Sequence, residues 1–155
     1  MEKIQKKIQK EYIGKADFMN IINADTHIVI ASGSIGVYIP KENAMIDYRE
    51  KLPHDITTGE ILVDEELVPR NLKGKPALLT NKLSYTDKHE IARKLISEDR
   101  TLESYVLIDA LKYFGQKVGY QITEKWVIAV EMGTSEIVGI ILPQSVNEEE
   151  MEEYV

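Results

Sequence analysis

The apolar positions of the segment YVLIDALKYFG, residues 105–115, recur with the spacing of one face of a helix. Ser104 or Thr101 could cap the start of this helix, and Gly115 could end it in a left-handed conformation. The pattern therefore predicts a helix from Ser104 to Phe114 that packs across the sheet formed by the strands after it. The expected buried face consists of Leu107, Ile108, Leu111 and Phe114.

Three segments after this helix have the length and composition of strands. They are KVGYQIT (117–123), WVIAVEM (126–132) and EIVGIILP (136–143), separated only by EK and GTS. Connections this short join antiparallel neighbours. We predict an antiparallel meander.

The same order of elements is predicted near the start of the chain. KADFMNIINAD (15–25) has the spacing of a helix, and HIVIAS (27–32), IGVYIP (35–40) and AMIDYR (44–49) resemble strands. The sequence thus predicts an α+β fold built from two helix-plus-antiparallel-meander halves. A further amphipathic helix is expected over EKIQKKIQKEYI (2–13).

An inserted segment separates the two halves. EILVDEELVP (60–69) is interpreted as one or two strands, and RNLKGKPALL (70–79) as a loop. YTDKHEIARKLISED (85–99) is predicted to be a helix that starts at Thr86 and turns Ile91, Leu95 and Ile96 inward.

The helix YVLIDALK and the final IILP resemble the C-terminal end of the bacterial sliding clamp, the processivity subunit of DNA polymerase III. The similarity covers residues 105–143. It implies a single DNA-clamp-like domain over residues 1–147, followed by a mobile acidic tail, 148–155. It also implies a non-enzymatic protein of DNA replication or of a mobile element, which binds the DNA backbone or replication proteins as a homo-oligomer.

The chain departs from the clamp family in two ways. Its 155 residues suffice for one domain, whereas a clamp chain has three such domains. Gln144 and Ser145 follow Pro143 where the family has an aliphatic residue and an arginine, which puts the partner-peptide groove in doubt. That groove would contain Leu142, Pro143 and Val146. The alternative is a small phage-type module that binds or inhibits a protein without forming a ring.

Charge is unevenly distributed along the chain. The net charge is −7, and five glutamates lie in the tail, while lysines cluster near the N-terminus. Lysines on helix surfaces could contact the phosphates of double-stranded DNA without reading sequence. The residues expected to do so are Lys3, Lys6, Lys7, Lys10 and Lys112, with Lys15, Arg93 and Lys94 as further candidates.

Composition excludes several other classes of protein. No apolar run approaches the ~20 residues of a membrane helix, the N-terminus lacks the apolar core of a secretory signal, and there is no cysteine. A cytoplasmic protein without membrane contact is expected.

No motif in the sequence predicts a cofactor, a metal ion or a nucleophile. His27, His54 and His89 lack ligand spacing, and Asp64, Glu65 and Glu66 are interpreted as a solvated strand edge. An enzyme whose site is assembled from distant residues remains a third alternative.

Overall fold

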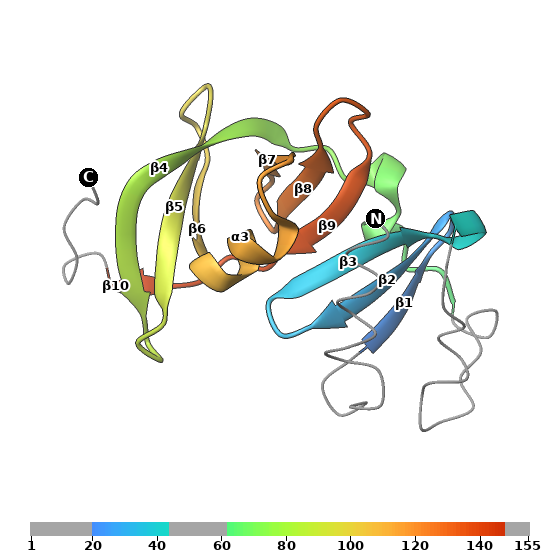
Figure 1. Ribbon diagram of the computed structural model, residues 1–155, viewed down its shortest axis with the longest axis horizontal. Helices are drawn as coiled ribbons and strands as arrows, with labels where there is room; N and C mark the ends of the chain where they lie inside the picture. Colours follow the sequence, from blue (N-terminus) through green and yellow to red (C-terminus); the bar gives the residue numbers. More distant parts are fainter. Residues whose placement is uncertain (1–19, 44–61, 148–155) are drawn as a thin grey trace. The chain divides into compact units, whose positions relative to one another are not determined.

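A computed structural model describes residues 20–43 and 62–147 (Figure 1). The chain divides into two compact units, Met1–Leu72 (unit 1) and Lys73–Val155 (unit 2). Each unit is described by itself. Within the described part of the chain, no helix has the length and apolar character needed to cross a membrane.

Unit 1 contains a meander of three antiparallel strands, β1 (Asn20–Ala24), β2 (His27–Ser32) and β3 (Ile35–Pro40). Short 3-10 helices follow: η2 (Lys41–Asn43), η3 (Glu65–Leu67) and η4 (Pro69–Asn71). Successive residues of β2 and β3 are buried, so both faces of this meander are covered. The fully buried side chains are Val29, Tyr38 and Ile39.

Unit 2 is an antiparallel sheet in the order β9-β8-β7-β4-β5-β6. The strands are β4 (Lys75–Thr86), β5 (Ile91–Ser97), β6 (Glu103–Leu107), β7 (Val118–Ile122), β8 (Val127–Glu131) and β9 (Ile137–Ile141). Its core contains Leu95, Val106, Ile122, Val127 and Ala129, each buried.

The long strand β4 bends around one side of unit 2 (Figure 1). Its first residues pair with β7, while its last residues, Tyr85 and Thr86, pair with the short strand β10 (Val146–Asn147). Between β9 and β10 the chain passes the edge of β6, where the Gln144 amide donates to the Tyr105 carbonyl at 2.8 Å. Residues 142–147 are therefore a closing segment that ties the far edge of the sheet back to β4.

The predicted fold class is wrong. The described residues are mostly antiparallel β-sheet with one α-helix, α3 (Ile108–Phe114), and not an α+β clamp of two helix-plus-meander halves. Asn20–Ala24, expected to be helical, is strand β1, because it pairs along its whole length with β2. The predicted helix over 85–99 is instead the end of β4, a turn and β5.

The predicted helix at 104–114 is half right. Tyr105 and Val106 pair with β5 as part of β6, so the helix begins only at Ile108, without a side-chain cap. Phe114 is buried as expected, whereas Leu107, Ile108 and Leu111 are half-buried. Tyr105, outside the predicted buried face, is buried. Gly115 ends the helix with φ +79°. The helix contacts mainly β6 and β5.

The meander β7–β8–β9 and the strands β2 and β3 confirm the corresponding predictions to within two residues. The segment 60–69 was predicted as strand, but from Glu65 it forms 3-10 helices, and residues 75–79, predicted as loop, belong to β4. The predicted elements at 2–13 and 44–49, and the acidic tail, lie outside the described residues.

Candidate functional site

One face of the β4–β5 hairpin carries apolar and aromatic side chains that remain partly open to solvent. Leu79 lies opposite Leu95, Leu83 opposite Arg93, and Tyr85 opposite Ile91. Directly opposed residues share a face of an antiparallel pair, and positions 91, 93 and 95 alternate onto one face of β5. We call these six residues the β4–β5 strip.

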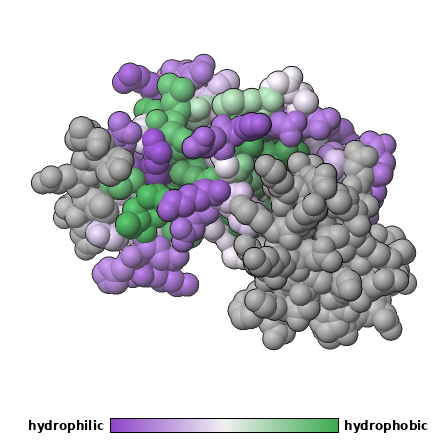
Figure 2. Space-filling model, in the orientation of Figure 1, coloured by the Kyte–Doolittle hydropathy of each residue, from purple (hydrophilic) through white to green (hydrophobic). Residues whose placement is uncertain are grey.

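The strip is apolar yet accessible. Leu79 is 39% exposed and Ile91 is 42% exposed, while Leu83, Tyr85 and Arg93 are half-buried and Leu95 anchors the strip in the core. On the side of unit 2 seen in Figure 2, apolar surface likewise interrupts the hydrophilic surface in the region of β4 to β6. Apolar area with a polar rim is typical of a surface that binds another protein.

A bulge shapes the middle of the strip. Between the pairs Leu79–Leu95 and Leu83–Arg93, β4 has three residues where β5 has one. The Arg93 Nε donates to the Thr80 carbonyl at 2.6 Å, and the Thr80 hydroxyl donates to the Lys94 carbonyl at 2.8 Å. These bonds satisfy backbone groups that the bulge removes from the ladder, so Arg93 holds the bend of β4 in place.

The hairpin is positively charged. Residues 75–97 contain five cationic side chains, from Lys75, Lys82, Lys88, Arg93 and Lys94, and two anionic ones, from Asp87 and Glu90, for a net charge of +3. Lys94 forms an ion pair with Glu103 at 2.9 Å, and Lys75 forms one with Asp99 at 2.8 Å. Lys82, in the bulge, and Lys88, in the turn, have no such partner within the described residues.

The turn beside the strip is ordered by local contacts. His89 has φ +60° and its ring meets the Tyr85 ring edge to face, with centroids 6.4 Å apart. The Glu90 amide donates to the Thr86 hydroxyl at 3.2 Å. The rigid turn fixes the register of the two strands, and so the spacing of the strip.

The β5–β6 turn contains a second polar cluster. The Asp99 carboxylate accepts hydrogen bonds from Lys75 at 2.8 Å, Ser97 at 2.7 Å and Thr101 at 2.6 Å. The bond from Lys75, followed by those from Ser97 and Thr101, holds the pKa of Asp99 well below its usual range. The contacts with Ser97 and Thr101 lie within the β5–β6 connection, and the contact with Lys75 ties this turn to the start of β4, so the cluster stabilises the fold.

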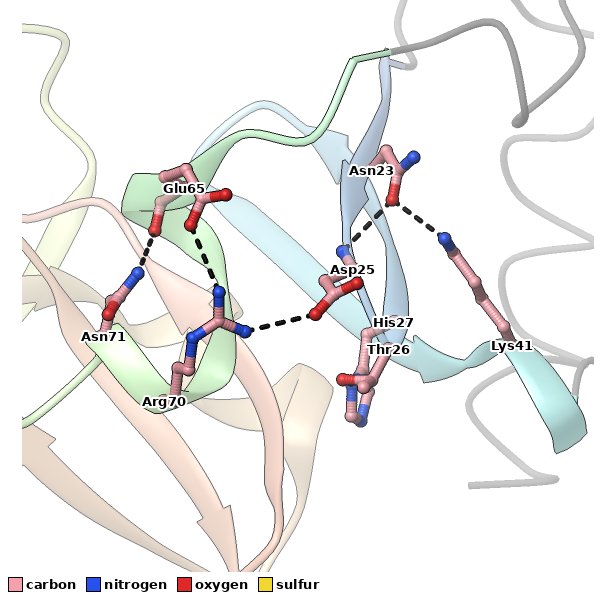
Figure 3. Close-up of polar contacts among 8 residues, drawn as sticks. All are labelled: Asn23, Asp25, Thr26, His27, Lys41, Glu65, Arg70 and Asn71. Carbon is pink, nitrogen blue, oxygen red and sulfur yellow. Dashed lines mark hydrogen bonds and ion pairs between the residues drawn. The ribbon is translucent and has the colours of Figure 1, made fainter.

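Unit 1 contains a polar network that fastens its 3-10 helices to the β1–β2 hairpin (Figure 3). The Arg70 guanidinium lies between Asp25, at 3.1 Å, and Glu65, at 3.3 Å. The Asn23 side-chain oxygen accepts from the Asp25 amide at 3.1 Å and from Lys41 at 2.9 Å. The carboxylates are occupied by partners in the same unit, so the network serves the fold.

Tyr38 completes the attachment of η3. Its buried hydroxyl donates to the Leu67 carbonyl at 2.5 Å. Burial, with a smaller effect of the Asp64 charge, raises the pKa of Tyr38 far above its usual value. In unit 2, burial raises the pKa of Tyr120 to about 12. Both phenols are therefore held neutral.

Of the five lysines expected to contact DNA, Lys112 alone lies in the described part of the chain. Lys112 is exposed on α3, whereas Lys3, Lys6, Lys7 and Lys10 lie outside the described residues, as does Lys15. The Arg93 Nε donates to the Thr80 carbonyl and Lys94 is ion-paired with Glu103, so both side chains have contacts within unit 2.

The residues expected to form a peptide groove lie on the closing segment. Leu142 is 46% exposed, and Pro143 and Val146 are half-buried, with Val146 paired to Thr86. The backbone of this segment is engaged by β6 and β4.

The residues considered as metal ligands take structural positions. His27 meets the Tyr38 ring edge to face at 5.9 Å, Asp64 caps η3 by accepting from the Glu66 amide at 3.1 Å, and His54 lies outside the described residues. The residues Asp64 to Glu66 do not form a strand edge, because they begin a 3-10 helix. Within the described ranges, no group of three or more histidines and carboxylates could hold a metal ion.

The strip was not predicted from the sequence, although the sequence contains a signal for it. Leu83 and Tyr85 before the turn TDKHE, and Ile91, Arg93 and Leu95 after it, alternate with period two. This is the pattern of a hairpin with one apolar face.

No family model, curated protein or solved structure matches this chain. The role of the strip is therefore inferred from the residues that form it.

Proposed function

We propose that the protein is a non-enzymatic binding module that uses the β4–β5 strip to hold an acidic, apolar segment of another protein. The observation that carries this proposal is the solvent exposure of Leu79 and Ile91 at the two ends of a strip centred on Arg93. Aromatic residues and arginine surrounded by aliphatic side chains are enriched at protein interfaces.

Charge favours an acidic partner. Lys75 and Lys94 of the hairpin are paired with Asp99 and Glu103, whereas Lys82 and Lys88 flank the strip without ion-pair partners in the described part of the chain. Carboxylates of a partner would meet these ammonium groups while its apolar side chains cover Leu79 and Ile91. Complementary charge mainly selects the partner and speeds association, and the buried apolar contact slows dissociation.

The proposal is tested with two labelled peptides of equal length, one alternating glutamate with leucine and one alternating lysine with leucine. Fluorescence anisotropy would be measured on the native chain and on a chain with Glu148, Glu149, Glu150, Glu152 and Glu153 changed to glutamine. We expect the acidic peptide to bind and the basic peptide to bind at least about tenfold more weakly. Absence of saturable binding of the acidic peptide to both chains would refute the proposal.

A matched pair of variants locates the binding surface. Leu78 and Leu79 are neighbours on β4, 56% and 39% exposed, but Leu78 pairs with Ile96 on the opposite face. Leu79→Ala combined with Ile91→Ala should weaken binding about tenfold, while Leu78→Ala should leave it within about twofold. An equal loss of affinity in the double variant and in Leu78→Ala would show that the peptide does not bind at the strip. A molar mass that falls on Leu79→Ala would identify the occupant as a second copy of this chain.

A further inference from the structure

The chain returns to the strip immediately before its acidic segment. β10 ends at Asn147, which lies opposite Tyr85 of the strip in the β10–β4 ladder. The Ser84 hydroxyl donates to the Asn147 carbonyl at 2.6 Å, and Ser84 is fully buried. Asn147, the residue that precedes 148–155 in the chain, is thus fixed beside one end of the strip.

The composition of residues 148–155 matches the ligand expected for the strip. The segment EEEMEEYV contains five glutamates together with Met151, Tyr154 and Val155, which are apolar. Its charge is opposite to the net charge of +3 on the hairpin. Eight residues can span up to about 27 Å, and the six-residue step from Tyr85 to Leu79 is roughly 20 Å along a strand. The segment is long enough to reach the far end of the strip.

We propose that residues 148–155 bind the β4–β5 strip of their own chain and compete there with the partner protein. The competition rests on the proposed function, because it assigns a regulator to the same surface. A short tether produces an effective concentration on the order of millimolar, so even a weak intramolecular contact occupies the strip for much of the time. Removing the negative charges frees the strip and raises its apparent affinity for a partner.

The contact itself can be tested without any partner. The chain contains no cysteine, so Val155→Cys provides a single site for a nitroxide label. Labelled chains with native glutamates, or with all five changed to glutamine, are compared by the broadening of backbone amide resonances. Leu79 and Leu95 are informative because they lie at the end of the strip remote from Asn147. Amides of β8 serve as the reference.

We expect the Leu79 and Leu95 amides to broaden in the native chain at low salt, and to recover in the glutamine chain and at about 1 M salt, where charges are screened beyond ~3 Å. Equal broadening in both chains would overturn the proposal. Mixing an isotope-labelled chain with a separate nitroxide-bearing chain tests whether the broadening arises within one chain or between two chains. Broadening in the mixture would mean that a second copy supplies the segment, which would also overturn it.

Affinity for the acidic peptide distinguishes this proposal from the proposed function. The glutamine chain should bind the peptide about three- to tenfold more tightly than the native chain. If the peptide binds both chains with equal affinity and the Leu79 amide does not broaden, residues 148–155 do not compete for the strip. The proposed binding function would then still stand. Broadening at Leu79 without peptide binding to either chain would reject the module and retain the contact between the segment and the strip.

Discussion

Tyr38→Phe should destabilise the protein through the loss of one buried hydrogen bond. The Tyr38 side chain is completely buried, and its hydroxyl is the donor to the Leu67 carbonyl at 2.5 Å. The substitution leaves that carbonyl without this donor in a region closed to water. Leaving a buried acceptor unsatisfied costs about 1 to 3 kcal/mol, and the ring itself is unchanged, so little is lost in packing.

Urea unfolding followed by circular dichroism measures this change in the free energy of unfolding. The dependence of that free energy on urea concentration should stay the same. Tyr85→Phe is the matched control. The Tyr85 side chain is half-buried in the strip, and its variant should stay within about 0.5 kcal/mol of the native chain. A Tyr38→Phe variant as stable as the control would refute the role assigned to this hydroxyl.

Alkaline pH provides an independent check on the same residue. The pKa of Tyr38 is raised in the folded state, mainly by burial. Such a group contributes its full stability below the unfolded pKa of about 10, and loses it as the pH rises towards the folded pKa, at up to about 1.4 kcal/mol per pH unit. The advantage of the native chain over Tyr38→Phe should therefore shrink above pH 10. Tyr120 is present in both chains, so its contribution cancels in the difference between their stabilities.

Three further predictions concern the core, the acidic segment and DNA. Leu95→Ala should lower the free energy of unfolding by about 2 to 5 kcal/mol, because Leu95 is fully buried. Leu111→Ala should lower it by less than about 2 kcal/mol, because Leu111 is half-buried. Urea titration measures both. Changing the five glutamates of 148–155 to glutamine should leave the thermal midpoint nearly unchanged, because a weak tethered contact contributes little stability, and a large fall would contradict this. If the chain binds duplex DNA, replacing Lys6, Lys7 and Lys10 together should flatten the salt dependence of binding by about three charges, and an unchanged slope would exclude those lysines.

The sequence predicts those parts of the fold that depend on neighbours in the chain. β7, β8 and β9 were located because alternation and two- or three-residue turns are local signals. The segment 85–99 was misread because Ile91, Leu95 and Ile96 also fit one face of a helix and Thr86 resembles a cap. Its strand form depends on pairing with both β4 and β6, and the helical pattern obscures the period-two alternation of Ile91, Arg93 and Leu95.

The candidate site was harder to predict than the strands. The strip exists only when Leu79, Leu83 and Tyr85 of β4 are set opposite β5 in one register, across a bulge. Tyr105 similarly fits a helical pattern in the sequence but lies in β6, where it pairs with Lys94 of β5. The resemblance of residues 105–143 to a clamp reflected a helix followed by strands, an order that an antiparallel sheet also contains.

The closing segment has a consequence for how unit 2 folds. β4 pairs with β5 across a short turn, with β7 more than thirty residues later, and with β10 some sixty residues later. Contacts so distant along the chain form late, because the loop between them must first be closed. The β4–β5 hairpin can therefore form early, before β10 pairs with β4. Weakening the Ser84–Asn147 contact should chiefly accelerate unfolding and leave the folding rate almost unchanged.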